Sequence, residues 1–250
     1  MSEAYRKFRQ ETEKEVRAQG ADREMLRATR SWMDGANRLK YSYHFEWMGR
    51  PIIQYPQDVM AMQELIWKVQ PDLIIETGIA HGGSLIFSAA MLELNAACGG
   101  PADAHVLGID IDIREHNRKA IEAHPMFRRI SLIQGSSVSP DVVAQVQAAA
   151  RDRKSVLVSL DSNHTHDHVL AELAAYAPLV SIGSYCVVFD TVIEDMPADM
   201  FPDRSWGPGN NPKTAVHAYL ATNAGFEIDH TVQNRLLITV APDGFLRRVR

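Results

Sequence analysis

Short apolar runs alternate with amphipathic segments through most of the chain, beginning near residue 57. The helical spacing is clear in the first such segment, where Val59, Met62, Ile66 and Val69 fall on one face. The apolar runs, such as Leu73-Ile74-Ile75, have the length of strands and do not alternate with polar residues. Strands have such continuous apolar sequences when helices cover both faces of a parallel sheet. The pattern therefore predicts an α/β fold with a mostly parallel sheet.

The predicted elements follow a regular strand-helix order. Strands are expected at 73–76, 105–112, 130–137, 155–163 and 183–190, and helices at 57–69, 84–97, 115–124, 140–151, 165–176 and 213–223. Two further strands, at 226–232 and 235–242, are too close together for a helix between them, so they are expected to form an antiparallel hairpin. Five parallel strands followed by such a hairpin suit the seven-stranded, Rossmann-like sheet of a class I methyltransferase better than that of a dehydrogenase.

The N-terminal part of the chain has a different character. Residues 1–34 have helical composition with few apolar positions, and residues 41–60 are rich in aromatics and broken by Pro51 and Pro56. We expect one or two helices and then a structured loop. The chain is therefore divided into a helical and aromatic extension, 1–56, and a catalytic domain, 57–250. The sparse apolar face suggests a lid or a subunit contact, and thus a homo-oligomer.

Composition narrows the class of protein. The chain is 46% hydrophobic and 23% charged with a formal net charge of −5, which is ordinary for a globular domain and lacks the basic character of nucleic-acid-binding proteins. Two cysteines, Cys98 and Cys186, are too few for a disulfide framework. No apolar run approaches the ~18 residues of a membrane span, and the charged N-terminus lacks the apolar segment of a signal peptide. These features predict a soluble cytoplasmic protein with no membrane or nucleic-acid partner.

A glycine-rich turn follows the first apolar run and indicates a ligand site, because ligands of open α/β sheets bind beyond the carboxyl ends of the strands. Gly78 and Gly83 have the interval of a P-loop, but Ser84 stands where that motif needs lysine. The spacing of Gly78, Gly82 and Gly83 also differs from the dinucleotide fingerprint G-x-G-x-x-G. Neither a triphosphate nor a dinucleotide is favoured.

Acidic residues close the first two predicted strands. Glu76 would repel a pyrophosphate, but it suits a ligand with ammonium and sulfonium charges. Asp110, or less well Asp112, could accept hydrogen bonds from ribose hydroxyls. S-adenosylmethionine has both features. The alternative is that the glycines only permit tight packing and the acids are solvated caps.

Longer segments resemble a known family. The stretches "WMGRPIIQYPQD", "PDLIIETGIAHGGS", "GIDIDIREHNR", "LDSNHTHDHVLAELAAYAPLVSIGSY" and "WGPGNNPKTAV" are similar to the cephalosporin hydroxylase family, which includes rhamnosyl O-methyltransferases of natural-product tailoring. The resemblance covers roughly residues 45–220 and implies a class I methyltransferase fold, S-adenosylmethionine as cofactor and often Mg²⁺. It implies a small-molecule acceptor, often a deoxysugar. The cofactor-binding residues expected are Glu76, Gly78, Gly82, Ser84, Asp110, Ser136 and Asp161.

The resemblance also implies a metal site. In the family, the fifth strand tends to end in two adjacent acids that hold the metal together with an aspartate after the fourth strand. Here Asp161 follows the fourth strand, but Phe189-Asp190 stands where two acids are expected. Asp161 and Asp190 could still hold Mg²⁺, which prefers oxygen ligands, with Glu194 or Asp195 as a substitute. The departure at Phe189 leaves a metal-free site open as well.

The catalytic and substrate residues are expected around the same edge of the sheet. A sugar hydroxyl is a poor nucleophile, so a base is needed, and His164 is the first choice with Asp161 beside it. His166 and His168 could instead be part of a polar helix cap with Thr165. The substrate is expected near Trp206, Trp47 and Asn210, although these aromatics could equally pin loops to the core.

Two other functions stay open at this point. A tailoring oxygenase could use Asp161, His164 and another histidine as an iron triad. A non-catalytic S-adenosylmethionine-binding partner protein would explain the missing acid at Phe189. The sequence favours an O-methyltransferase acting on a sugar hydroxyl.

Overall fold

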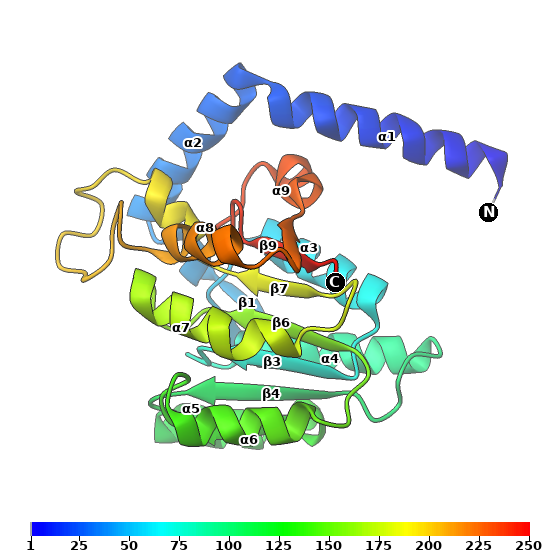
Figure 1. The fold of residues 1–250 in the computed structure, drawn as a ribbon, viewed down its shortest axis with the longest axis vertical. Coiled ribbons are helices and arrows are strands. Elements are labelled where there is room, and N and C mark those ends of the chain that lie inside the picture. The colour runs from blue at the N-terminus through cyan, green and yellow to red at the C-terminus, as the bar shows by residue number, and fades with distance from the viewer. Residues whose placement is uncertain (1) are drawn as a thin grey trace.

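A seven-stranded sheet forms the centre of the protein, which a computed structural model describes for residues 2–250. The strand order is β5-β4-β3-β6-β7-β9-β8 (Figure 1). The strands from β5 to β7 are parallel, and β9 pairs antiparallel with both β7 and β8. Their bounds are β3 Leu73–Thr77, β4 His105–Asp110, β5 Ile130–Gln134, β6 Val156–Leu160, β7 Tyr185–Val188, β8 Phe226–Ile228 and β9 Phe245–Arg248. The predicted mixed, mostly parallel sheet is confirmed.

Helices cover both faces of this sheet. One face packs against α3 (Pro56–Val69), α4 (Gly83–Ala97) and α5 (Glu115–Glu122), through residues such as Ile66, Leu85 and Ile121. The other face packs against α6 (Pro140–Ala150), α7 (His166–Tyr176) and α8 (Pro212–Thr222). Short 3-10 helices lie at Pro125–Arg129 (η2), Ala177–Leu179 (η3) and Thr191–Asp195 (η4). The strand β3 is buried along its whole length, which explains its continuous apolar sequence.

The N-terminal segment consists of two helices, as expected. Helix α1 (Glu3–Ala21) and α2 (Arg23–Arg38) meet at Asp22, whose carboxylate accepts hydrogen bonds from the first amides of α2. Figure 1 shows α1 reaching away from the sheet, with its C-terminal half near α9. The predicted aromatic loop contains η1 (Tyr41–His44) and a small hairpin of β1 (Phe45–Trp47) and β2 (Arg50–Ile52).

The C-terminal end differs from the prediction. The strand expected at 226–232 ends at Ile228, and residues 230–236 form the helix α9 (His230–Leu236). The strand expected at 235–242 is wrong, because the last strand is β9 at Phe245–Arg248. β8 and β9 do form an antiparallel pair, but the helix α9 connects them instead of a hairpin turn. Asp229 accepts a hydrogen bond from the amide of Thr231 and caps this helix.

None of the helices formed by residues 2–250 is long and apolar enough to cross a membrane. Both cysteines are free thiols, Cys98 exposed and Cys186 buried.

Candidate active site

A cavity of about 970 Å³ lies at the carboxyl ends of the parallel strands. Its walls come from the segments that follow β3, β4, β5, β6 and β7, from the loop before α8 and from the N-terminal extension. Of the residues predicted from the sequence, it brings together Gly78, Ser84, Asp110, Ser136, Asp161, His164, Asp190 and Trp206. This is the edge where ligands of open α/β sheets bind.

The glycine turn is held close to the end of β6. Gly78 has a φ of +88°, and a Cβ atom there would lie 1.9 Å from the carbonyl oxygen of Asp161. Asp110 fixes the same turn, since its Oδ2 accepts hydrogen bonds from the amides of Ile79 at 2.8 Å and Ala80 at 3.3 Å. Glycine at position 78 is therefore required by the backbone itself, and Asp110 joins the ends of β3 and β4.

Glu76 lies beneath the cavity and does not line it. Its side chain is buried, and its Oε1 accepts a hydrogen bond from the hydroxyl of Ser84, which does line the cavity. Burial raises the pKa of Glu76 to about 7, and the Ser84 hydrogen bond opposes that rise. A cation bound above Ser84 would therefore favour the ionised carboxylate.

Gly82 lies at the start of α4, between two residues that line the cavity. It is the N-cap of α4 with a φ of +83°, and a Cβ there would lie 2.5 Å from Cδ1 of Ile121. Gly82 is also outside the lining of the cavity. Its place in the structure is that of a left-handed helix cap packed against α5.

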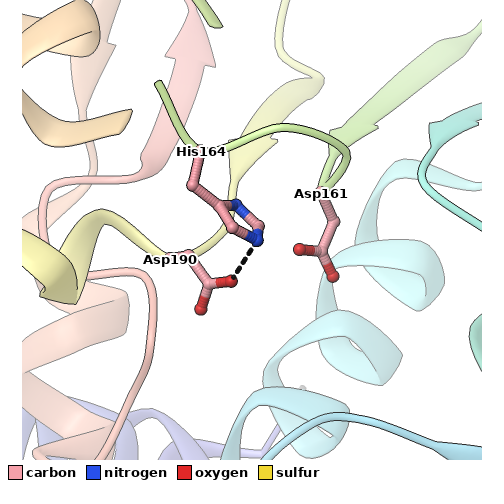
Figure 2. Close-up of side chains that lie close together, drawn as sticks. All are labelled: Asp161, His164 and Asp190. Atoms are coloured by element: carbon pink, nitrogen blue, oxygen red, sulfur yellow. Dashed lines mark ion pairs between the residues drawn. The ribbon is translucent and has the colours of Figure 1, made fainter. Parts of the chain in front are cut away.

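Three side chains converge at the ends of β6 and β7 (Figure 2). Each of Asp161, His164 and Asp190 offers a donor atom, and these atoms all lie within 4.8 Å of one another. The His164 Nε2 atom is 3.2 Å from Oδ2 of Asp190. Asp190 has a φ of +56°, an unusual conformation for a residue other than glycine. Such backbone conformations are concentrated at functional sites.

The electrostatics of this cluster favour a cation. Burial raises the pKa of Asp161 well above its usual range, and the neighbouring carboxylates of Asp190 and Glu76 raise it further. A divalent cation would stabilise the two charged carboxylates, and oxygen ligands are those that Mg²⁺ prefers. Among the residues from 2 to 250, this is the only group of three potential metal ligands so closely spaced. The donor set therefore fits a divalent ion.

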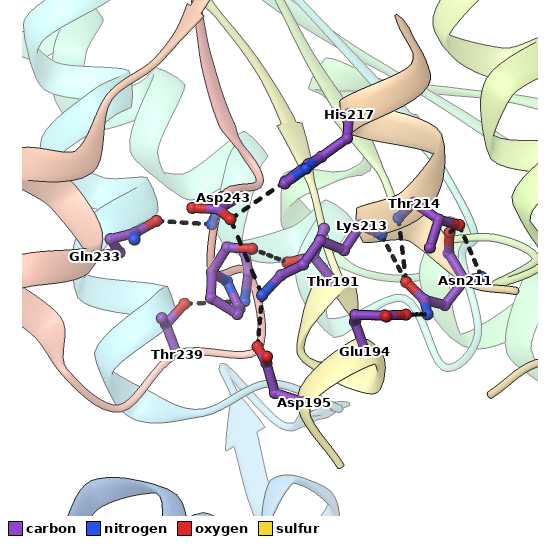
Figure 3. A network of polar contacts seen from close by, with 12 residues as sticks. Thr191, Glu194, Asp195, Asn211, Lys213, Thr214, His217, Gln233, Thr239 and Asp243 are labelled. Carbon is purple, nitrogen blue, oxygen red and sulfur yellow. Dashed lines mark hydrogen bonds and ion pairs between the residues drawn. The ribbon is translucent and has the colours of Figure 1, made fainter. Parts of the chain in front are cut away.

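The position expected to carry a second acid is part of the core. Phe189 is 2% exposed and packs among apolar residues on the α3 and α4 side of the sheet. The two acids considered as substitutes are engaged elsewhere (Figure 3). Glu194 accepts hydrogen bonds from the Gly209 amide and the Asn211 side chain, and Asp195 pairs with Lys213 at 2.5 Å. Glu194 and Asp195 thus connect the two ends of the 196–211 loop, and both acids considered as substitute metal ligands are used in these contacts.

The three predicted substrate residues have different surroundings. Trp206 lines the cavity with its ring edge-on to His164 at 5.5 Å between centroids. Trp47 packs edge-on against Phe87 at 4.9 Å and does not line the cavity. Asn210 also lies outside the lining, and it accepts a hydrogen bond from the His166 amide and donates one to the Ser205 carbonyl. The structure thus brings only Trp206 to the cavity.

Sequence reasoning missed a second polar group in the cavity wall. His168 Nε2 lies 3.1 Å from Oγ of Ser137 and 3.2 Å from Oγ of Ser162. The extension also contributes to the wall through Asn37, Lys40 and Tyr43. His168 and Glu172 are four residues apart on a helix, and this spacing could have indicated that their side chains interact. The contribution of the extension depends on tertiary packing and has no local signal.

Comparisons with known proteins place the chain in a family. The family profile Rhamnosyl O-methyltransferase/CmcI matches residues 39–249. The Rhamnosyl O-methyltransferase of Mycobacterium tuberculosis (strain ATCC 25618 / H37Rv) is 33% identical over 196 residues, which are 76% of this chain and 73% of that protein. The protein of the same name from Mycobacterium leprae (strain TN) is 30% identical over 205 residues, 81% of this chain and 82% of that protein.

Solved structures show the same fold. The structure described as cmcI-D160 Mg-SAM superposes with a TM-score of 0.57 at 19% identity, covering 83% of this chain and 78% of that one. The CmcI-N160 apo-structure gives a TM-score of 0.56 at 20% identity over 83% of this chain and 77% of that one. Together with the family match and the sequence relatives, these structures identify the chain as a class I methyltransferase. The chain belongs to the Rhamnosyl O-methyltransferase/CmcI family and is an S-adenosylmethionine-dependent O-methyltransferase.

Proposed function

We propose that this enzyme transfers the methyl group of S-adenosylmethionine to a sugar hydroxyl, in a deoxysugar such as rhamnose. The observation that carries the proposal is the Asp161, His164 and Asp190 cluster in the wall of the cavity. Two mycobacterial relatives at 30–33% identity are named Rhamnosyl O-methyltransferase, which supports the sugar class of acceptor. A role in natural-product biosynthesis is part of the same proposal.

His164 is proposed as the base that accepts the hydroxyl proton. Asp190, at 3.2 Å from its Nε2, can orient the imidazole and stabilise the imidazolium that forms. Proton transfer to a positioned histidine contributes typically about 10²–10⁴-fold to a rate. Trp206 lies edge-on to the same imidazole, where its ring could stack on a sugar face and hold the hydroxyl near His164.

Asp161 and Asp190 are proposed to hold Mg²⁺. When bound, the ion would lower the pKa of the acceptor hydroxyl and fix its oxygen. The clustered donor atoms and the raised pKa of Asp161 support this assignment. A tailoring oxygenase has less support, since the cluster holds one histidine and two carboxylates and the iron triad of such enzymes needs two histidines and one carboxylate.

The proposed cofactor site runs along the ends of β3 and β4. Ser84 and the Glu76 carboxylate beneath it would suit the positively charged methionine end, Gly78 would let the cofactor approach the turn, and Asp110 would hold the ribose hydroxyls. Ser136, after β5, lines the part of the cavity that would hold the adenine. Gly82, the N-cap of α4, is proposed to shape the same turn.

The division at residue 56 is proposed to separate a wall-forming extension from the catalytic domain. Asn37, Lys40 and Tyr43 line the cavity, so the extension helps to enclose the substrate. Exposed Tyr5 and Phe8 on α1 suit contact with a second copy of the chain. Sedimentation of the full chain and of a chain starting at residue 23 would test this, and a monomer in both cases would contradict it.

A screen of acceptors tests the proposed function. The enzyme with labelled S-adenosylmethionine and Mg²⁺ is offered rhamnosides, nucleotide-linked deoxysugars and, as a non-sugar control, a catechol. Labelled sugar product is expected. Labelling of the catechol alone would contradict the sugar assignment, and a hydroxylated product would contradict methyl transfer.

A further inference from the structure

His168 lies in the wall of the cavity and is not one of the three clustered residues Asp161, His164 and Asp190. It lies on the first turn of α7, and its side chain is 21% exposed toward the cavity that it lines. Its contacts come from three segments: Ser137 after β5, Ser162 after β6 and Glu172 on α7. No role in the reaction described so far uses this residue.

The hydrogen bonds around His168 fix where its ring proton lies. Glu172 is fully buried, and its Oε1 accepts a hydrogen bond from the Ser162 hydroxyl at 2.7 Å. Because the Ser162 proton is donated to Glu172, its Oγ can only accept from the imidazole. The same Nε2 lies 3.4 Å from Oε1 of Glu172. Two acceptors on one nitrogen place the proton on Nε2.

The other ring nitrogen is then a hydrogen-bond acceptor. In a neutral imidazole with its proton on Nε2, Nδ1 carries a lone pair. Within residues 2–250, no side chain or backbone group forms a hydrogen bond with Nδ1 of His168. A second oxygen of Glu172, Oε2, is buried without a partner in the same part of the chain.

The direction of the cofactor follows from the order of the strands. The sheet runs β5-β4-β3-β6-β7, and the reacting groups Asp161, His164 and Asp190 follow β6 and β7. Asp110 ends β4, where an acidic residue faces the ribose of nucleotides in related folds. The adenine of the cofactor must therefore extend away from β7, toward the segment after β5 that carries Ser137 beside His168.

We propose that His168 recognises the adenine of S-adenosylmethionine, with Nδ1 accepting a hydrogen bond from the exocyclic amino group. Glu172 and Ser162 act through His168 as positioning residues, since they hold its Nε2–H. The contact would let the enzyme distinguish adenine from a base with a carbonyl at that position, because two acceptors cannot share a hydrogen bond.

Binding of two inert cofactor products tests the proposal. S-adenosylhomocysteine and its deaminated form, S-inosylhomocysteine, differ at the amino group and the adjacent ring nitrogen. Titration calorimetry at a pH where free imidazole is neutral should show wild type binding the adenosyl form at least about tenfold more tightly. Equal affinities for wild type would overturn the proposal. No acceptor is needed, so the result is independent of which sugar is methylated.

Two substitutions separate recognition from structure. His168→Gln places an amide near the Nε2 position and keeps the tie to Glu172, but it has no acceptor near Nδ1, so the preference should fall to within about threefold. His168→Asn keeps an oxygen near the Nδ1 position and should retain most of the preference. Because both ligands are measured on one preparation, partial unfolding cancels from the ratio. A wild-type preference in His168→Gln would overturn the assignment.

Discussion

The imidazole of His164 and the carboxylate of Asp190 meet across the ends of two neighbouring strands, with 3.2 Å between Nε2 and Oδ2. His164 follows β6, and Asp190 follows β7 in a left-handed backbone conformation. The pairing matters because a carboxylate beside an imidazole both orients the ring and stabilises its protonated form. It links the proposed base to the proposed metal site.

Removal of the imidazole should reduce turnover far more than cofactor binding. We expect His164→Ala to lower kcat by about 10²–10⁴-fold, because the acceptor proton loses its positioned base. The Kd for S-adenosylhomocysteine should stay within about threefold of wild type. Steady-state kinetics and calorimetry measure the two quantities. His116→Ala, an exposed histidine on α5, is the matched control and should leave both unchanged. Unchanged turnover in His164→Ala would contradict the role of His164.

Loss of the metal-binding carboxylate should abolish the dependence of turnover on a divalent ion. We expect EDTA to lower the turnover of wild type by at least about tenfold and Mg²⁺ to restore it. Asp190→Asn should show low turnover with either treatment and lose Mg²⁺ binding by calorimetry. Asp199→Asn, an exposed acid in the adjacent loop, is the control. Full activity of wild type in EDTA, with no Mg²⁺ binding, would contradict the metal site.

A methyl group at position 78 should disrupt the turn. Gly78→Ala would force a Cβ to within 1.9 Å of the Asp161 carbonyl at a φ of +88°, so we expect a loss of about 1–3 kcal/mol of unfolding free energy and weaker cofactor binding. Gly35→Ala is the control, because nothing lies within 4 Å of its Cβ and it is in helix α2. That change should be neutral or stabilise by up to about 1 kcal/mol. Urea denaturation of both variants measures the difference, and equal stability would contradict the close approach.

Burial of Glu76 should make the stability of the cofactor-free enzyme depend on pH. The folded-state pKa of about 7 exceeds the ordinary value of 4.5, so the folded state binds more protons than the unfolded state between these values. Stability from this group therefore falls as pH rises from about 4.5 to 7. Glu76→Gln, which can still accept from Ser84, should gain about 1–3 kcal/mol relative to wild type between pH 5 and pH 8. Glu46→Gln, an exposed acid, should show no such gain. Parallel pH profiles for Glu76→Gln and wild type would contradict the burial effect.

The parts of the site that sequence could predict are those fixed by local pattern. Gly78 and Asp161 each follow a buried apolar strand and Asp110 ends one, and parallel strands bring their carboxyl ends to one edge. The α/β order and the two N-terminal helices were likewise readable from periodicity. These predictions depend little on contacts between residues that are far apart in the sequence.

The parts that could not be predicted depend on long-range contacts. The apolar run Leu236–Val240 reads as a strand, but Asp58 on α3 is buried against it and accepts hydrogen bonds from Thr239 and Val240. The ion pair between Asp195 and Lys213 likewise occupies an acid that could be assigned to a metal site from the sequence alone. Neither contact has a signal in the neighbouring residues.

Transfer of a deuterated methyl group tests whether this enzyme methylates a sugar hydroxyl. The enzyme is incubated with S-adenosylmethionine carrying CD₃, Mg²⁺ and a rhamnosyl acceptor from the screen, and the product is analysed by mass spectrometry and NMR. We expect a CD₃ group on a ring hydroxyl oxygen of the sugar, with a greatly lowered rate of transfer in His164→Ala. Label on a non-sugar atom, or no transfer to any sugar by an enzyme that binds the cofactor, would contradict it.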